Sequence, residues 1–288
     1  MKNKFLLFLV ILIALSVGVL GYYTYFIYEE GEEVVVTKED LTDNEMSEVL
    51  DGFPYASLLD ATDKGVSDLT SEEILLIGYS GLTENDIIEN GAWNCDESEE
   101  NSDLVKCIVE SFGLAEAKVE ELDTSLWETV LGGSTGYEMF SKELLIKKIS
   151  DRLGITEDYN ESFVKTIEIS GIPLTFIYDN NVNMFFTHQG GAAGPGTTSA
   201  TSILDGYNEG NTYVINIVKG MFDSYEDGDS YYYKLYAESN SEEILKEGID
   251  FSDLEAYVEE YADQLDNYKL TFKKVGDTYQ FVSIEMVN

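Results

Sequence analysis

The chain has 288 residues, with 56 Asp and Glu against 17 Lys and Arg, so its formal net charge at pH 7 is −39. This balance argues against nucleic acid as a partner, because phosphate binding requires clustered Lys and Arg; one His and one Arg also exclude a two-imidazole metal site and a multi-guanidinium phosphate site. Hydrophobic residues make up 44% and aromatic residues 12% of the chain, which is enough to bury a core.

The first predicted element is a transmembrane helix over residues 5–27, which carry no charged side chain. A helix of that length spans about 34 Å, more than the hydrocarbon core of a bilayer at about 30 Å. Lys2 and Lys4 precede the apolar run and Glu29 and Glu30 follow it, so residues 1–4 are expected in the cytoplasm and the rest outside. A cleavable signal peptide is the alternative, and it also places the remainder outside the cytoplasm.

Residues 29–45 are acidic and are expected to form a stalk, followed by a mainly helical region over residues 46–155. A capping box from Thr70 to Glu73 predicts one helix start. Ser141 predicts another, with Gly154 at the end of that helix and the basic residues Lys148 and Arg152 one turn apart on a solvated face.

The two cysteines, Cys95 and Cys107, flank a short acidic stretch. Outside the cytoplasm an even pair this close in sequence predicts a disulfide, which would stabilise the fold by about 3 kcal/mol. Two separate buried thiols are the alternative, since Cys107 falls within an apolar helical pattern.

Residues 156–288 are predicted to form an antiparallel β-meander with one covering helix. Turns are expected at Asp179–Asn181 and at Val275–Asp277, and Ser252 is expected to cap the covering helix with Glu255 completing the box. The predicted fold class is therefore α+β: an N-terminal transmembrane helix, a helical subdomain, then the meander.

One motif could carry nucleophilic catalysis. Gly132–Gly136 matches G-x-S-x-G, in which glycines allow a strained turn that exposes Ser134. Asp179 and the single imidazole, His188, follow in the chain order of an α/β-hydrolase triad. The sequence lacks the βα repeats that surround such an elbow, so a flexible glycine turn between two helices is the favoured interpretation.

Residues 188–202 are rich in Gly, Ala, Ser and Thr and are predicted to form a long mobile loop between strands. A loop that gates a ligand or contacts a partner is the alternative. The stretch lacks the G-K-[ST] arrangement of a phosphate-binding loop.

The acidic stretch from Asp223 to Asp229 is predicted to be a turn between two strands. Asp223, Asp227 and Asp229 have partial calcium-loop spacing, but Tyr225 stands where a third-position ligand belongs. Calcium is therefore the alternative, and no cofactor is the favoured expectation.

These patterns favour a single-pass membrane protein whose extracytoplasmic part is a non-enzymatic binding or structural module. Its expected partners are the lipid bilayer, through residues 5–27, and a cationic or protein partner at the cell surface, which its acidic field would attract. The alternative function is an anchored serine hydrolase that uses Ser134 and His188.

Overall fold

Two antiparallel sheets and several helices make up the described part of the chain, which confirms the expected mixture of α and β structure. The computed structural model describes residues 37–59, 63–90, 95, 101–128, 137–169, 172–190, 196–228, 230–237 and 243–287. The predicted transmembrane segment and residues 29–36 of the predicted stalk lie outside these ranges. The rest of the predicted stalk is not a free linker, because Lys38–Asp40 form strand β1 and helix α2 begins at Asp43. None of the helices within them combines the length and the apolar composition needed to cross a bilayer.

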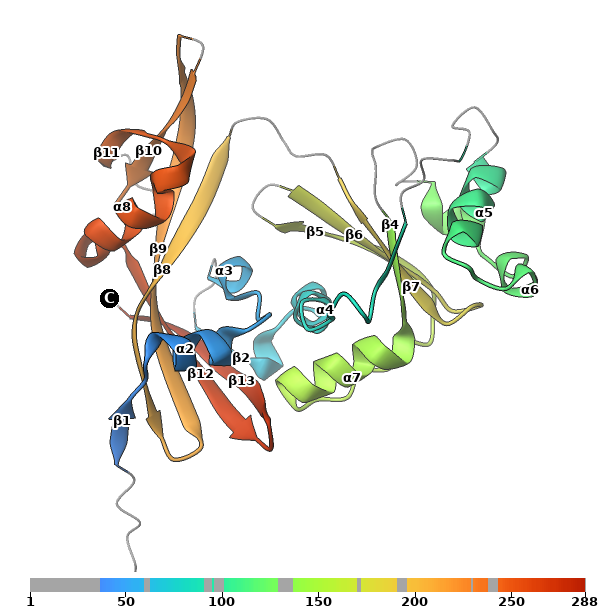
Figure 1. Cartoon of the computed structure of the whole chain (residues 1–288), viewed down its shortest axis with the longest axis horizontal. Helices are drawn as coiled ribbons and strands as arrows, with labels where there is room; N and C mark the ends of the chain where they lie inside the picture. Colours follow the sequence, from blue (N-terminus) through green and yellow to red (C-terminus); the bar gives the residue numbers. More distant parts are fainter. Residues whose placement is uncertain are drawn as a thin grey trace, which may run out of the picture. The chain divides into compact units, whose positions relative to one another are not determined.

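The smaller sheet has five strands in the order β3-β4-β7-β6-β5 (Figure 1). Its strand β4 comes from the region expected to be mainly helical, so the sheet draws on both sides of the boundary expected near residue 155. In chain order, its strands are β3 (Ile88–Asn90), β4 (Tyr137–Ser141), β5 (Phe163–Ile169), β6 (Ile172–Asp179) and β7 (Met184–Gln189). The turn between β6 and β7 follows Asp179, as the sequence predicts.

Both faces of this smaller sheet are buried. Successive side chains of a strand point to opposite faces, and along β6 Phe176 and Tyr178 belong to one hydrophobic cluster whereas Ile177 belongs to another. The same alternation on β7 sends Phe185 to the first cluster and Phe186 to the second. The central strands are apolar on both faces for this reason.

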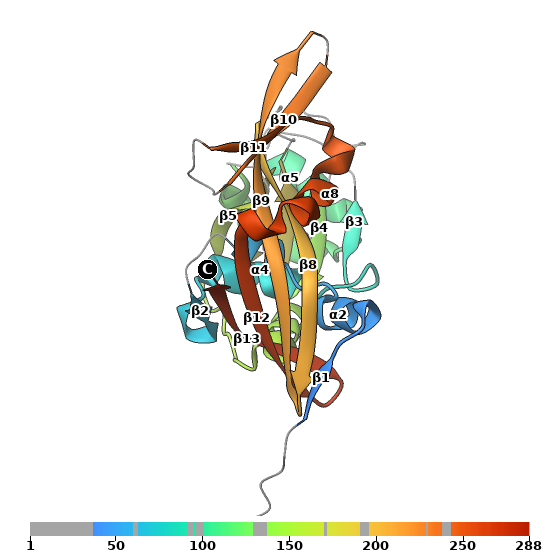
Figure 2. The same cartoon turned by 90° about the vertical axis from the view of Figure 1, so that its left-hand side faces the viewer.

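The larger sheet has eight strands, with the path β1-β8-β9-β12-β13-β2 and with β10 and β11 added beside β9 (Figure 2). The turn predicted at Val275–Asp277 joins its last two strands, β12 and β13. In chain order, its strands are β1 (Lys38–Asp40), β2 (Lys64–Gly65), β8 (Thr197–Glu209), β9 (Thr212–Asp227), β10 (Ser230–Tyr236), β11 (Ile244–Ile249), β12 (Asp266–Val275) and β13 (Thr278–Val287).

The helices are mostly short. The α-helices are α2 (Asp43–Leu50), α3 (Tyr55–Leu58), α4 (Ser71–Tyr79), α5 (Asn101–Ser111), α6 (Glu116–Val119), α7 (Lys142–Leu153) and α8 (Leu254–Glu260). The 3₁₀ helices are η1 (Val66–Asp68), η2 (Thr124–Trp127), η3 (Phe251–Asp253) and η4 (Ala262–Gln264).

The predicted helix ends are correct in two cases and wrong in one. Thr70 caps α4 with the predicted box, and Ser141 caps α7, which ends at Gly154 in the left-handed conformation with φ 67°. The covering helix α8 instead has Asp253 at its N-cap with no side-chain cap hydrogen bond, because Phe251–Asp253 form the 3₁₀ turn η3. Ser252 is therefore not the cap.

The main hydrophobic cluster joins the inner faces of the two sheets through α2, α4 and α7. Ile215, Ile217 and Leu270 of the larger sheet share this cluster with Phe140 and Phe176 of the smaller one. Tyr79 at the end of α4 donates a hydrogen bond to Glu138 of β4, and its burial raises the pKa of Tyr79. This contact ties α4 to the smaller sheet.

The basic residues of α7 are engaged with neighbouring segments. Lys148 forms an ion pair with Asp86 at 3.0 Å. The half-buried Arg152 donates to the backbone carbonyl of Asp51 at 2.9 Å. A Cβ added at Gly81 would lie 2.5 Å from Nε of Arg152, so the glycine makes room for the guanidinium stem.

The outer face of the larger sheet packs against α8. Val218 and Phe222 of β9 share a third cluster with Leu254 and Val258 of α8. At Gly220, an added Cβ would lie 2.7 Å from Cγ2 of Val258, so this glycine permits the close approach of α8 to β9.

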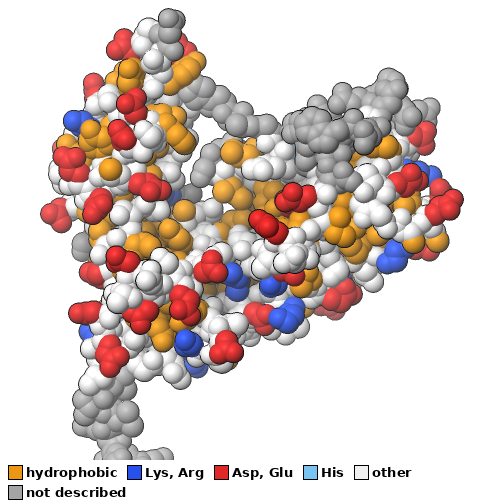
Figure 3. All heavy atoms as spheres, in the orientation of Figure 1, with side chains coloured by type: hydrophobic (Ala, Val, Ile, Leu, Met, Phe, Trp, Pro, Cys, Tyr) orange, Lys and Arg blue, Asp and Glu red, His pale blue; other side chains and the backbone are white. Residues whose placement is uncertain are grey.

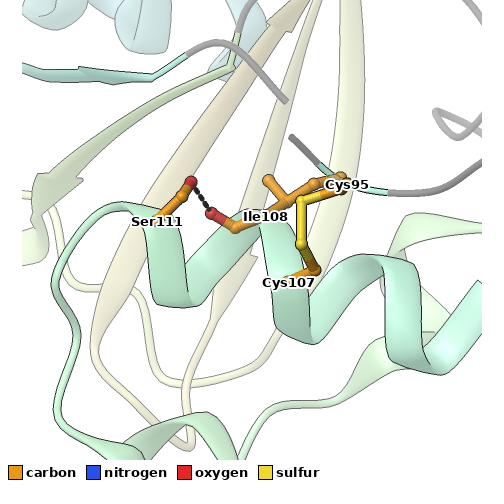
Figure 4. The surroundings of a disulfide bond; sticks show 4 residues. All are labelled: Cys95, Cys107, Ile108 and Ser111. Carbon is orange, nitrogen blue, oxygen red and sulfur yellow. Dashed lines mark hydrogen bonds between the residues drawn. A yellow bond between two sulfur atoms is a disulfide. The ribbon is translucent and has the colours of Figure 1, made fainter. Parts of the chain in front are cut away.

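Cys95 and Cys107 are joined as a disulfide, with 5.9 Å between their Cα atoms (Figure 4). The bridge ties residue 95 to α5, whose Ser111 hydroxyl donates to the carbonyl of Ile108 one turn earlier. Helix α5 packs its apolar face, including Val105 and Val109, into the cluster on the outer face of the smaller sheet.

Candidate functional site

A cavity of about 440 Å³ lies where β8 passes between α8 and α3. Its volume falls within the range of about 300–1,000 Å³ that is usual for ligand sites. We call it the β8-edge cavity, and the residues that line it are Ala56, Thr198, Ser199, Ala200, Thr201, Phe251, Ser252, Leu254 and Glu255.

The lining shows that this cavity wraps around the edge of a sheet. Four consecutive residues of β8, Thr198–Thr201, contribute to it, although successive side chains of a strand point to opposite faces. Ala200 packs with the α8 cluster, whereas Ile203 packs with the main cluster on the other face. The cavity therefore reaches α8 on the outer face of β8 and Ala56 of α3 on the inner face.

The outer edge of β8 is open along this stretch of the described chain. On that side β8 meets only the three-residue strand β1, beside which the amide of Leu41 donates to the carbonyl of Gly206 at 2.9 Å. A register shift between Ile203 and Asp205 separates the β1-paired part of β8 from the part that lines the cavity. An unpaired edge presents a row of backbone donors and acceptors to any extended chain.

Natural open edges are usually protected by Lys, Pro or inward-pointing charges. Residues 197–203 of β8 contain none of these, only Thr, Ser, Ala and Ile. Their side chains from Thr198 to Ile203 are half-buried. This stretch therefore has a backbone that is suited to pairing and lacks the usual devices that prevent it.

The electrostatic surroundings of the cavity are negative. Glu255 lines it directly, and from Asp250 to Gln264 every ionisable side chain other than tyrosine is a carboxylate. Figure 3 shows red carboxylates spread over the surface around α8 and the β9–β10 hairpin, with blue side chains sparse there. Of the nearby lysines, Lys234 pairs with Glu247 at 3.3 Å and Lys246 lies over the ring of Tyr257. The buried Lys219 of β9 lies across from Thr201 on one side and across from Asp266 of β12 on the other. The site therefore favours cations.

An exposed aromatic side chain stands at the rim of the cavity. Phe251 is 67% exposed, an unusual state for a phenylalanine, and its ring lies 5.8 Å from that of Tyr233. Leu254, beneath it, is buried. A ligand that covered Phe251 would remove this apolar surface from water.

Comparisons of the chain with family models, curated proteins and solved structures gave no match. The chemistry of the cavity is therefore the basis for assigning a function.

The structure places the hydrolase candidates apart. His188 is buried on β7, where it pairs with Thr175 of β6 and packs against the ring of Tyr137 at 4.9 Å. Asp179 lies four residues beyond Thr175 on β6, which is about 13 Å at the rise of a strand. Hydrogen-bond reach is about 3 Å, so Asp179 does not orient this imidazole. Ser134 lies outside the described residues.

Asp179 has a structural role in the hairpin turn. Its carboxylate accepts the backbone amides of Asp123 and Asn181, at 2.7 and 2.9 Å, and so joins η2 to the turn after β6. Burial raises the pKa of Asp179 despite these two hydrogen bonds.

The calcium candidates lie on a strand, so the predicted acidic turn is wrong over Asp223–Asp227. Strand β9 continues to Asp227, which places Asp223 and Asp227 about 13 Å apart, too far to share an ion held at about 2.5 Å from each ligand oxygen. Asp223 accepts a hydrogen bond from Thr197 at 2.6 Å, and Asp229 lies outside the described residues. In the described ranges, no group of three or more His, Cys, Asp or Glu could hold a metal ion.

The four residues of β8 that line the β8-edge cavity, Thr198–Thr201, fall within the loop predicted over residues 188–202. His188 and Gln189 belong to β7, and Thr197–Ser202 belong to β8. The Gly- and Pro-containing stretch before Thr197 favours a loop, but Thr197, Thr198 and Thr201 are β-branched residues that favour a strand. A strand start at residue 197 was therefore detectable in the sequence.

Proposed function

We propose that the protein is a membrane-anchored, extracytoplasmic binding module and that the β8-edge cavity is its ligand site. The observation that supports the ligand site most directly is the cavity itself, where an open sheet edge, an exposed Phe251 and the acidic Glu255 meet.

The anchor is part of the same proposal. The uncharged run over residues 5–27 and the lysines before it support a single membrane span with residues 1–4 in the cytoplasm. The Cys95–Cys107 disulfide supports an oxidising compartment for the remainder. Protease treatment of intact cells should remove residues after about 30 and leave a membrane-bound stub; a protected chain in the soluble fraction would refute the anchor.

The ligand site can be tested on the full-length protein in phosphatidylcholine nanodiscs. A collection of neutral fluorinated fragments is screened by ¹⁹F NMR against the wild type and against Ala56→Trp, which fills the cavity from the exposed side of α3. Fragments should bind the wild type and lose binding to Ala56→Trp. Ala117→Trp, on the exposed surface of α6, is the matched control and should bind as the wild type does.

Fragment binding that is unchanged in Ala56→Trp would refute the cavity as the ligand site, and so would an absence of hits. Both replaced alanines are exposed, so each Trp variant should fold. Thermal unfolding of both variants checks this.

A further inference from the structure

We propose that the β8-edge cavity binds an extended cationic peptide, which adds to the larger sheet as a new strand beside Thr197–Ile203. This inference rests on the proposed function of the cavity as a ligand site, and it names the class of ligand.

The open edge determines the conformation of the ligand. Residues 197–203 of β8 pair with β9 on one side and with no other strand of the described chain on the other side. A strand added at an edge forms hydrogen bonds with every second residue of that edge. An extended peptide backbone would therefore pair with the N–H and C=O groups of β8 that have no strand partner. At about 3.3 Å per residue this edge accommodates a strand of about six residues.

The two ends of the edge limit the register. The irregularity around Leu204 interrupts the ladder, and β1 covers β8 from about Gly206 onward. Leu204 is 41% exposed at that position, as expected for an extra residue in a bulge. An added strand therefore ends near Leu204 and lies entirely beside the cavity.

The cavity provides different surroundings for the two faces of an added strand. Side chains on its outer face meet Phe251 and Leu254, and those on its inner face meet Ala56. The exposed ring of Phe251 suits an aliphatic side chain, because covering it removes apolar surface from water. This alternation favours a ligand with apolar residues at every second position.

The charge of the site determines the charge of the ligand. Glu255 lines the cavity, Glu226 and Asp227 lie at the exposed end of β9, and the chain as a whole carries −39. Alternate side chains of an added strand point to the inner face, where Lys219 is buried, so its lysines would be attracted by the field of the whole chain, whereas an acidic strand would be repelled.

The test uses full-length protein in phosphatidylcholine nanodiscs and the labelled peptide acetyl-(Lys-Val)₃-amide, with empty nanodiscs as the blank. Two further peptides carry N-methyl groups, one on the lysine amides and one on the valine amides. In an added strand only one of these two sets of amides faces β8, so one methylated peptide should bind about tenfold more weakly or worse and the other within about threefold of the parent.

Two variants localise the binding. Ala56→Trp should remove it, and Ala117→Trp should leave it unchanged. Glu255→Gln should weaken it about threefold at low salt and less at high salt, because the contribution of an exposed charge is screened. The peptide acetyl-(Glu-Val)₃-amide should not bind.

Equal binding of both methylated peptides would overturn strand addition. Electrostatic adsorption does not distinguish the lysine amides from the valine amides, whereas an added strand does. Fragments that bind the cavity while no peptide binds would overturn the inference and leave the proposed ligand site standing. If neither fragments nor peptides bind, the inference and the proposed function both fail.

Discussion

The two sheets of this protein differ in how completely they are covered. The smaller sheet is buried on both faces, and Phe176, Ile177, Phe185 and Phe186 along its central strands have no exposed surface. The larger sheet ends in a wing formed by residues 197–203 of β8, residues 221–227 of β9, β10 and the adjoining η3 and α8, where most side chains are half-buried or exposed. Because both of its faces are covered, the smaller sheet has only its edges available for binding. The wing has an open edge with a cavity beside it.

This difference separates positions that maintain the fold from positions that are available for binding. In the smaller sheet, polar residues such as Asp179 and Glu138 are used up by internal hydrogen bonds. In the wing, Phe251 and Glu255 are exposed and contribute little to the core. Substitutions in the two regions should therefore have opposite effects on stability and on binding.

The largest effect on stability is expected from Phe186→Ala in the smaller sheet. Phe186 is fully buried and its ring lies 5.0 Å from that of Trp127, so truncation should reduce the free energy of unfolding by about 3–5 kcal/mol. Phe251→Ala in the wing should change it by less than about 0.5 kcal/mol while weakening peptide binding. Urea unfolding measures both; similar losses in the two variants would contradict the comparison.

Loss of the disulfide should have the next largest effect on the free energy of unfolding, again in the part of the molecule that packs on the smaller sheet. Replacing both Cys95 and Cys107 with Ser should cost about 3 kcal/mol, because the open chain has more unfolded conformations. Hydrogen exchange should accelerate in α5 and remain unchanged in β8. A reducing agent should destabilise the wild type and not the double variant; a response from both would assign the effect to another cause.

A smaller effect is expected at the contact between α4 and α7. Gly81→Ala places a Cβ against the Arg152 side chain and should cost about 1–3 kcal/mol, since the guanidinium must leave the carbonyl of Asp51. Gly65→Ala, whose nearest neighbour would lie at 3.4 Å, is the matched control and should cost less than about 0.5 kcal/mol.

A double-mutant cycle identifies the cause of the Gly81 effect. In an Arg152→Ala background the added methyl meets no guanidinium, so Gly81→Ala should cost little more. A cost that persists unchanged in that background would show that the backbone, not Arg152, excludes the methyl group.

The smallest effect is a change in the acid dependence of stability. Hydrogen bonds from the Thr83 amide and from Lys148 lower the pKa of Asp86 to about 2. Because the folded-state pKa is depressed, the stabilisation by Asp86 is complete above its ordinary pKa of 3.8 and is lost as the pH falls through about 2. The stability difference between wild type and Asp86→Asn should therefore shrink across this window.

The Lys148→Met variant sharpens that measurement. It removes the ion-pair partner but leaves the Thr83 hydrogen bonds, so it should retain part of the acid dependence. Identical curves for wild type and Asp86→Asn between pH 4 and pH 2 would contradict the role of Asp86.

Short-range features of the fold were predictable from the sequence. The caps at Thr70 and Ser141, the hairpin turns after Asp179 and Val275, and the pairing of Cys95 with Cys107 each depend on residues close together in the chain. Their physical causes are local hydrogen bonds, turn geometry and a short loop, so no knowledge of distant segments was needed.

The errors arose where distant segments override local preference. The acidic run Asp223–Asp227 is a strand because β10 pairs with it along its whole length and β8 pairs with Asp223, and this pairing satisfies its backbone. Ser252 does not cap α8 because it lies within the 3₁₀ turn Phe251–Asp253, and α8 begins only after that turn. The start of α8 is fixed by Leu254, which packs into the α8 cluster. Neither partner is visible within the local window.

The sequence by itself determined the negative charge, the apolar opening segment, the mixed antiparallel architecture and the cysteine pair, because composition, periodicity and short loops are local properties. Only the tertiary structure decided which faces and edges are covered. The β8-edge cavity joins residues near positions 56, 200 and 253. The pairing of β6 with β7 sets His188 opposite Thr175, four residues away from Asp179. Coverage depends on contacts between residues far apart in the chain, so it appears only when the strands are paired and the helices are packed against them.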